Sequence, residues 1–466
     1  MSTALIQNGT IVTASERYQA DIYVEGGVIS LIGRALSLPA ATVIDASGRL
    51  VLPGGVDVHT HLDMAAGQAT TSDDFETGTI AAAHGGTTTI VDFASQAPGE
   101  GLGPALEARK KQAEGKAVID YAFHLAVHEL TEAVAEDMDR MVRHEGVTSF
   151  KLFMAYPGVH MVDDATVFRA MRRTRENGGL VCLHAENGGV IQVLVQEALA
   201  RGDTAPRFHA LTRPTETEAE ATARAVALAE MAGAPVYVVH VSCAEALDAI
   251  RRARSRGMQA YAETCPQYLL LSSEEYEREG FEGAKFVMSP PLRETRHQQA
   301  LWEGLARGEV QVVATDHCPF CMDRPPHKRV GQEDFSKIPG GAPGVETRLP
   351  LLWDAGVRAG RIDAHRFVEV TATNPAKLLG LWPRKGAIAI GSDADLLVWD
   401  PDREVSLSAA ALHMRVDYSP YEGRTVRGGP VTVLSRGEVI VDRGEFRGQA
   451  GRGQFVKRKA RKSSPA

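Results

Sequence analysis

The 466-residue sequence has no long apolar run and few cysteines. Nowhere do eighteen apolar residues follow one another, and the first residues, MSTALIQNGTIV, lack the basic segment, apolar core and cleavage site of a secretion signal. The five cysteines are an odd number, scattered through apolar segments, which suits a reducing compartment. We therefore expect a soluble cytoplasmic protein with no membrane partner.

The sequence also lacks an excess of positive charge. Its 51 Lys and Arg residues stand against 59 Asp and Glu residues, giving a formal net charge of −8. Nucleic acid requires a basic face on its partner, so we expect no nucleic-acid partner. The length, with 44% hydrophobic residues, suffices for a substantial core, and we expect one large domain with a smaller companion.

Short apolar runs separated by turn residues occupy both ends of the chain. The runs ALIQNGTIV and ADIYVEGG near the start, and ADLLVWD and VTVLSRGEVIVD near the end, are typical of strands joined by tight turns. We predict a small β-sandwich formed by both termini, over residues 1–54 and 385–450. The basic segment 451–466 is interpreted as a solvated tail, with a subunit contact as the alternative.

Eight apolar runs of β type alternate with helical segments over residues 55–384. The runs are GVDVH, TTTIVDF, YAFHLAV, TSFKLF, LVCLH, VYVVH, QAYAE and VQVVATD. Segments such as EAEATARAVALAEMAG carry apolar residues at three- and four-residue spacing, as helices around a barrel do. We predict an α/β fold with a (β/α)8 TIM barrel as catalytic domain. The alternative, an open doubly wound sheet, favours a glycine-rich first turn that GVDVHTH lacks.

Residues able to bind metal stand where the predicted barrel strands end. His59 and His61 lie two apart on the first strand, so their side chains share a face. The carboxyl ends of barrel strands meet at one mouth, and imidazole and carboxylate groups bind zinc, manganese, cobalt or iron. We predict a divalent-metal site, with zinc as the default ion. Its ligands are His59, His61, Lys151, His184, His240 and Asp316.

Lys151 is the unusual member of this set, because an ammonium ion repels cations and offers no lone pair. A carbamate formed from its neutral amine and carbon dioxide would present two anionic oxygens, able to bridge ions about 3.5 to 4 Å apart. We hypothesise this modification of Lys151. The alternative is an ordinary ion pair of the unmodified lysine.

Seven motifs between residues 56 and 339 resemble the hydantoinase/dihydropyrimidinase branch of the amidohydrolase superfamily, and with the basic, glycine-flanked tail the resemblance spans nearly the whole chain. They are VDVHTHLD, FKLF at Lys151, HAEN from His184, HVSC from His240, MSPPLR at Ser289, TDHCPF at Asp316 and the downstream FSKIP. The resemblance implies hydrolysis of the ring amide bond of a dihydropyrimidine or 5-substituted hydantoin to an N-carbamoyl amino acid. It also implies two divalent ions, a small cyclic ureide substrate and a homotetramer.

The same resemblance implies a role for each site residue. One ion is held by His59, His61, carboxylated Lys151 and Asp316, and the other by Lys151, His184 and His240. Tyr156 would stabilise the oxyanion, and Asp316 would move a proton from the attacking water to the leaving nitrogen.

Substrate binding is implied for Tyr156, Ser289 and Gly340, the last two acting through main-chain groups. The family commonly has Asn where Gly340 stands, and a main-chain contact survives that change. The segment Met64–Gly67 carries smaller residues than those often found there, which predicts a roomier pocket for the ring substituent.

Four alternatives remain at this point. An allantoinase-like enzyme shares the fold and the metal chemistry. A dihydroorotase-like chain has an arginine shortly after H-x-H, where Leu62 and Asp63 stand here. The collapsin-response mediator proteins are non-enzymatic assembly proteins of this branch but lack a complete ligand set, whereas all six positions are filled here. A serine or cysteine nucleophile is the last alternative, but there is no G-x-S-x-G motif and the cysteines lie within strand or loop runs.

Overall fold

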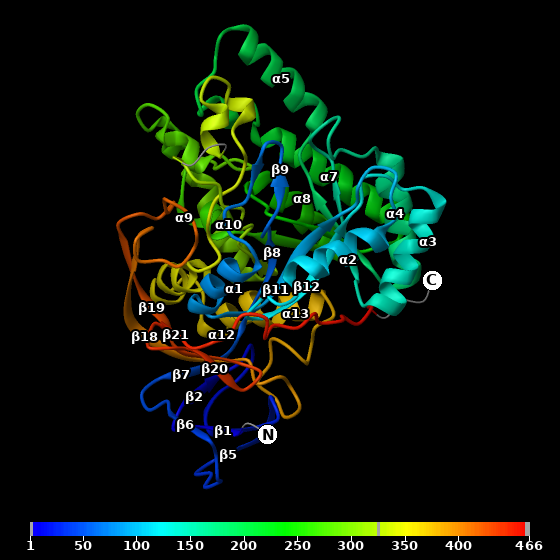
Figure 1. Ribbon diagram of the computed structural model, residues 1–466. Coiled ribbons are helices and arrows are strands. Elements are labelled where there is room, and N and C mark those ends of the chain that lie inside the picture. Colours follow the sequence, from blue (N-terminus) through cyan, green and yellow to red (C-terminus); the bar gives the residue numbers. More distant parts are fainter. Residues whose placement is uncertain (1–2, 324–326, 462–466) are drawn as a thin grey trace.

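Two bodies make up the molecule, a barrel and a β-sandwich beneath it (Figure 1). The computed structural model describes residues 3–323 and 327–461. The described residues include no helix long and apolar enough to cross a membrane.

Eight parallel strands form the barrel sheet, in the order β17-β16-β15-β14-β13-β12-β11-β8. They are β8 (Gly55–Thr60), β11 (Thr87–Ser95), β12 (Asp120–Ala126), β13 (Ser149–Phe153), β14 (Leu180–His184), β15 (Val236–Val238), β16 (Ala260–Thr264) and β17 (Val312–Val313). The ring closes beyond β17, where His61 N donates to His317 O at 2.8 Å and Thr60 forms a parallel bridge with His317. The predicted (β/α)8 barrel is confirmed.

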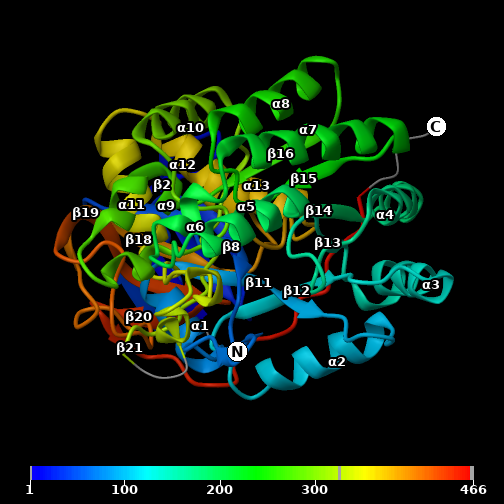
Figure 2. The same ribbon diagram turned by 90° about the horizontal axis from the view of Figure 1, so that it is seen from above.

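Helices surround the strands, as the view from above shows (Figure 2). They are α1 (Phe75–His84), α2 (Leu102–Ala113), α3 (Glu132–Arg140), α4 (Asp164–Asn177), α5 (Gly188–Ala200), α6 (Phe208–Leu211), α7 (Thr215–Ala232), α8 (Ala244–Ser255), α9 (Pro266–Leu270), α10 (Thr295–Arg307), α11 (Arg348–Leu352), α12 (Ala364–Val368) and α13 (Asn374–Leu378). Local sequence sets their ends. In α4, the Asp163 side chain caps the first turn, and Gly178 ends the helix with a left-handed φ of 80°.

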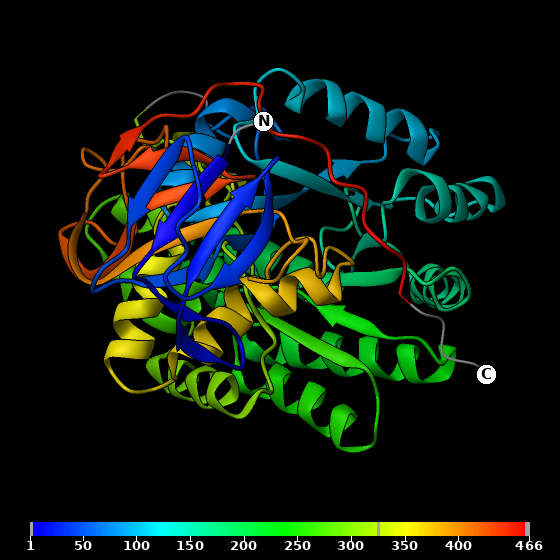
Figure 3. The ribbon, with the colours of Figure 1, turned by 90° about the horizontal axis from the view of Figure 1, so that it is seen from below.

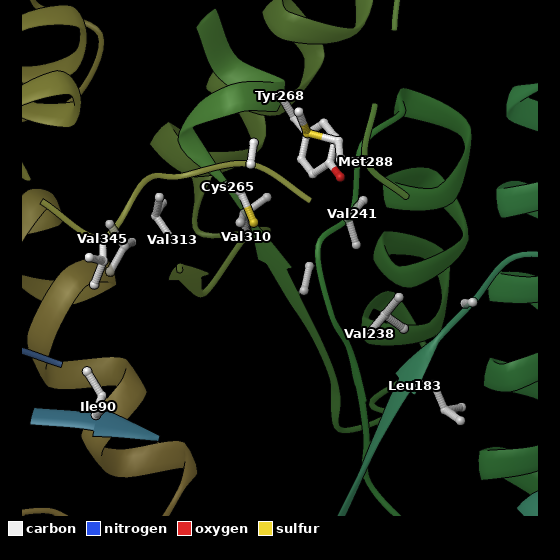
Figure 4. Close-up of a cluster of buried hydrophobic side chains, with 14 of the residues drawn as sticks. Ile90, Leu183, Val238, Val241, Cys265, Tyr268, Met288, Val310, Val313 and Val345 are labelled. Carbon is white, nitrogen blue, oxygen red and sulfur yellow. The ribbon is translucent and has the colours of Figure 1, made fainter. Parts of the chain in front are cut away.

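The strands alternate between two apolar layers. Val91, Cys182 and Tyr237 face the barrel interior, and the neighbouring Ile90, Leu183 and Val238 belong to the layer under the helices. Figure 4 shows part of this outer layer. Burial on both faces explains why the barrel strands read as nearly continuous apolar runs.

Strands from both termini form the β-sandwich, confirming that prediction. One sheet has the order β5-β4-β1-β6 and the other β21-β20-β19-β18-β7-β2-β3. The strands are β1 (Thr3–Gln7), β2 (Thr10–Val12), β3 (Arg17–Gln19), β4 (Asp21–Glu25), β5 (Val28–Gly33), β6 (Thr42–Asp45), β7 (Leu50–Pro53), β18 (Leu396–Leu407), β19 (Arg424–Ser435), β20 (Glu438–Asp442) and β21 (Glu445–Phe446). In the second sheet, β7 pairs with β18 in antiparallel register, Leu52 opposite Leu397. The boundaries at residues 54, 385 and 450 stay a prediction.

The basic C-terminal segment closes the lower end of the barrel, where Figure 3 shows it in red. Val456 N donates to Tyr121 O at 2.7 Å, and the Val456 side chain joins the apolar cluster of the barrel interior. Arg458 is 3% exposed and donates to Ser149 Oγ at 2.8 Å. Ser149 Oγ in turn donates to His124 Nδ1 at 2.6 Å. Within residues 451–461, Val456 and Arg458 are buried against the barrel, whereas Lys457, Lys459 and Ala460 are exposed. The interpretation as a solvated tail stays a prediction; residues 462–466 lie outside the described residues.

Arg458→Ala is expected to lower the free energy of unfolding by about 2–3 kcal/mol, because it removes hydrogen bonds from a buried charged group and leaves a cavity. Urea denaturation measures the change. Lys459→Ala is the control, since that neighbouring side chain is exposed and makes no hydrogen bond to a described residue. Equal unfolding midpoints for the two variants would contradict the closing role of Arg458.

Candidate metal centre and active site

A cavity of about 630 Å³ opens at the carboxyl ends of the barrel strands. All six predicted metal ligands line it, together with the predicted substrate-binding residues. These nine residues are His59, His61, Lys151, Tyr156, His184, His240, Ser289, Asp316 and Gly340. The carboxyl ends of the barrel strands therefore meet at one mouth, and the predicted side chains surround it.

His59, His61 and Asp316 form a compact group able to hold a metal ion. Asp316 Oδ1 lies 3.2 Å from His59 Nε2 and 3.1 Å from His61 Nε2. Burial lowers the pKa of His59 well below its usual value, so its ring is neutral and keeps a lone pair. Burial opposes ionisation of Asp316, but the two histidines beside it lower its pKa to about 2.

Lys151, His184 and His240 line the neighbouring part of the cavity. The rings of His184 and His240 meet edge to face with centroids 4.5 Å apart. Lys151 Nζ lies between the rings of Phe93 and Phe153, 5.3 and 5.2 Å from their centroids. Burial lowers the pKa of Lys151 to about 8. No carboxylate among the described residues forms an ion pair with Lys151, so the ordinary ion pair of the alternative interpretation is not formed within that part of the chain.

Three of the eight described non-glycine residues with positive φ line the cavity. Tyr156, His240 and Asp316 have φ of 66°, 40° and 51°, in a region that side chains other than glycine rarely adopt. Such conformations persist where the surrounding structure enforces them, and they cluster at functional sites. Burial raises the pKa of Tyr156, so its hydroxyl stays protonated and available as a donor at neutral pH.

Ser289 and Gly340 lie next to each other in one wall of the cavity. A Cβ built on Gly340 would lie 4.0 Å from Ser289 Oγ and meet no closer atom than 3.9 Å, so there is room at this position. Gly341 differs, because its φ is 147° and a Cβ there would lie 2.4 Å from Cys318 O. The wall thus depends on glycine at 341 and leaves 340 open toward the cavity.

Glu263, at the end of β16, is a site residue that the sequence reasoning missed. His59 Nδ1 donates to its Oε1 at 2.6 Å, and the Tyr237 hydroxyl donates to its Oε2 at 2.7 Å. The amide of His240 also donates to Oε1, at 3.1 Å. A carboxylate that takes the second ring nitrogen fixes the tautomer and orientation of a ligand histidine. Glu263 ends the apolar run QAYAE, much as the predicted ligands end theirs, and this position was the sequence signal that could have identified it.

Glu186 supports His184 in the same manner. His184 Nε2 donates to Glu186 Oε2 at 2.7 Å, which leaves Nδ1 of that ring for other partners. Glu186 is fully buried, and although burial opposes its ionisation, the bond from His184 lowers the pKa of its carboxyl. The two predicted halves of the metal centre thus each have a buried carboxylate behind a histidine.

Comparison with known proteins agrees with this geometry. The sequence model of the amidohydrolase family matches residues 50–440 of this chain.

The chain belongs to the amidohydrolase family.

This amidohydrolase is 52% identical over 456 residues to a D-hydantoinase of Geobacillus stearothermophilus, covering 98% of this chain and 96% of that protein. It is 51% identical to a D-hydantoinase of Streptomyces coelicolor, covering 98% of each. A crystal structure of dihydropyrimidinase from Brevibacillus agri superimposes with a TM-score of 0.97 at 50% identity, covering 99% of this chain and 100% of that one.

A second group of the amidohydrolase, His84, Glu346 and His413, also has the composition of a metal site. The rings of His84 and His413 stack face to face, with centroids 3.4 Å and planes 8° apart. Lone pairs of parallel stacked rings cannot both point at one ion, and His413 Nδ1 already donates to Glu346 Oε1 at 2.8 Å. The barrel mouth is therefore the better metal site of the two.

Glu263→Gln is expected to weaken metal binding about 10- to 100-fold, because a ligand histidine loses its orienting carboxylate. Competition with a chromogenic chelator measures the affinity. Glu303→Gln serves as control, since this glutamate pairs with Arg307 and Gln299 on α10 and does not line the cavity. Unchanged affinity in Glu263→Gln would remove it from the metal centre.

Proposed function

We propose that this amidohydrolase cleaves the ring amide bond of dihydropyrimidines or 5-substituted hydantoins, releasing N-carbamoyl amino acids. The observation that carries the proposal is the single cavity lined by the complete ligand set together with Tyr156, Ser289 and Gly340. Relatives named D-hydantoinase and dihydropyrimidinase, at about half identity over nearly the full length, support it.

Two divalent ions, zinc by default, are proposed as the cofactors. His59, His61, Asp316 and a carbamate on Lys151 would hold one, and Lys151, His184 and His240 the other. The neutral ring of His59 and the carboxylates behind two of the histidines fit such ions. When bound, the ions would supply Lewis-acid chemistry, lowering the pKa of bound water toward about 7 and polarising the ring carbonyl.

The side chains of this chain would then divide the remaining work. The protonated Tyr156 hydroxyl would donate to the carbonyl oxygen as negative charge develops there. Asp316 would accept the proton of the attacking water and pass it to the ring nitrogen as the C–N bond breaks. Main-chain groups of Ser289 and Gly340 would hold the planar amide of the ring, and a roomy pocket near Met64 would take the substituent.

A homotetramer and a cytoplasmic location are proposed alongside this activity. Helix α5 projects from the barrel (Figure 1) and exposes Val190 and Val193 to 47% and 52%, apolar area that suits a subunit contact. All five cysteines are buried within the fold, which suits a reducing compartment. Light scattering coupled to size exclusion tests the assembly.

A substrate panel tests the activity. Metal-loaded enzyme supplied with carbon dioxide is expected to open dihydrouracil and 5-substituted hydantoins, with the N-carbamoyl products measured by chromatography. Turnover of allantoin alone would replace the proposal with an allantoinase. No turnover of any cyclic ureide by folded, metal-loaded protein would overturn it.

A further inference from the structure

Lys328 is a buried lysine that the proposed mechanism does not use. It begins the short helix η4 (Lys328–Gly331) and has no exposed surface. No carboxylate among the described residues forms an ion pair with it. Burial lowers the pKa of Lys328 to about 7, which shows how unfavourable this position is for an ammonium group.

Three main-chain carbonyls surround the Lys328 ammonium. Its Nζ donates to Val287 O at 2.8 Å, to Pro339 O at 2.9 Å and to Gly341 O at 2.8 Å. An ammonium group has three N–H donors, one for each of the three carbonyls. A neutral amine has only two N–H donors and would leave one carbonyl without its hydrogen bond. The contacts therefore favour the cation and make Lys328 a three-way tie between separate chain segments.

The tied segments form the cavity wall that carries Ser289 and Gly340. Val287 stands two residues before Ser289, and Pro339 and Gly341 flank Gly340 on both sides. Gly341 N also donates to Val287 O at 2.9 Å, so the two segments contact each other directly as well as through Lys328. Both lack helix and strand structure at these residues, so ties of this kind fix their geometry.

We propose that Lys328 is a positioning residue for substrate binding, which holds the main chain at Ser289 and Gly340 in the register needed to grip the ring amide. This inference deepens the proposed function and rests on it. Lys328 lies behind the wall and touches no reacting atom. The wall would bind the ring equally in the ground state and in the transition state. Loss of Lys328 would therefore weaken substrate binding and raise KM, with little effect on kcat.

Steady-state kinetics on metal-loaded enzyme tests the inference, with dihydrouracil and hydantoin as substrates. Lys328→Met keeps the length of the side chain and removes all donors. Its KM is expected to rise at least about tenfold for both rings, with kcat within about threefold of wild type and metal content unchanged. Lys328→Gln, which keeps two donors on a shorter side chain, is expected to fall between wild type and Lys328→Met.

Arg329→Met is the matched control. Arg329 is the next residue of η4, is also cationic, and reaches outward to Asp323 at 2.6 Å. Its KM is expected to equal that of wild type. Thermal unfolding is measured for every variant, and the kinetics are then run at a temperature at which all variants are folded. If Lys328 only stabilised the fold, its replacement would lower the unfolding temperature but leave the KM of the folded enzyme unchanged.

Three outcomes would overturn the inference: a wild-type KM in folded Lys328→Met, a parallel loss of kcat and bound metal, or failure of both Lys328 variants to fold. The last would assign Lys328 to the stability of the fold. Failure of the proposed function is distinguishable, because the wild-type enzyme itself would then open neither ring.

Discussion

Asp316→Asn is expected to lower kcat about 10²- to 10⁴-fold, the size of a lost general acid–base group. Asparagine keeps the shape of the side chain but neither the negative charge beside His59 and His61 nor a basic oxygen that takes up a proton. The low pKa of Asp316, about 2, means that the native carboxylate is ionised throughout the range in which the enzyme is assayed.

Metal analysis separates the two roles of Asp316. Elemental analysis that finds full metal content in the inactive Asp316→Asn variant would assign the loss to proton transfer, and a missing ion would assign it to metal binding. Asp402→Asn is the control, because this exposed aspartate of β18 pairs with Arg358 and does not line the cavity. Near-normal turnover by Asp316→Asn would refute both roles.

Lys151→Ala is expected to abolish metal binding at the mouth and to lower turnover roughly 10³-fold or more, because the proposed bridging carbamate is lost. Native mass spectrometry of the wild-type chain is expected to show the added mass of one carbon dioxide, which disappears in Lys151→Ala. Short-chain carboxylic acids are expected to restore part of the metal content and activity, since a free carboxylate offers the same pair of oxygens.

Lys111→Ala provides the comparison for the mass measurement. Lys111 is exposed on α2, so its replacement should leave the added mass in place. An unmodified amine at Lys151 in fully metal-loaded protein, or a single bound ion, would contradict the proposed two-ion centre.

The barrel and its ligands were predictable because both follow local rules. Each barrel strand is a short apolar run, and most of the proposed ligands stand near or just beyond the end of such a run, where the strands reach the mouth. Lys151 departs from this rule, because it is the third residue of β13. Asp316 shows the limit of that rule, since the final strand covers only Val312–Val313 and the ligand follows three residues later.

The supporting residues could not be predicted in the same way. Glu263 ends a strand as the ligands do, but a single glutamate carries no mark that its partner is His59, which lies far away in the chain. Lys328 donates to main-chain carbonyls, which every residue possesses, so no pattern of side chains in the sequence indicates its partners. Arg458 sits in a basic stretch typical of solvated termini, and only the folded barrel supplies Ser149 as a partner.

The pairing of β7 with β18 has a consequence for how the protein is made. These two strands are neighbours in the sheet, but the entire barrel lies between them in the sequence. Strand β7 therefore emerges from the ribosome long before β18 is synthesised. At typical synthesis rates that interval is roughly tens of seconds, during which one sheet edge has no neighbour and invites association with other nascent chains. Contacts between such distant segments also form slowly. The vulnerable stage in the life of this protein is therefore its own translation.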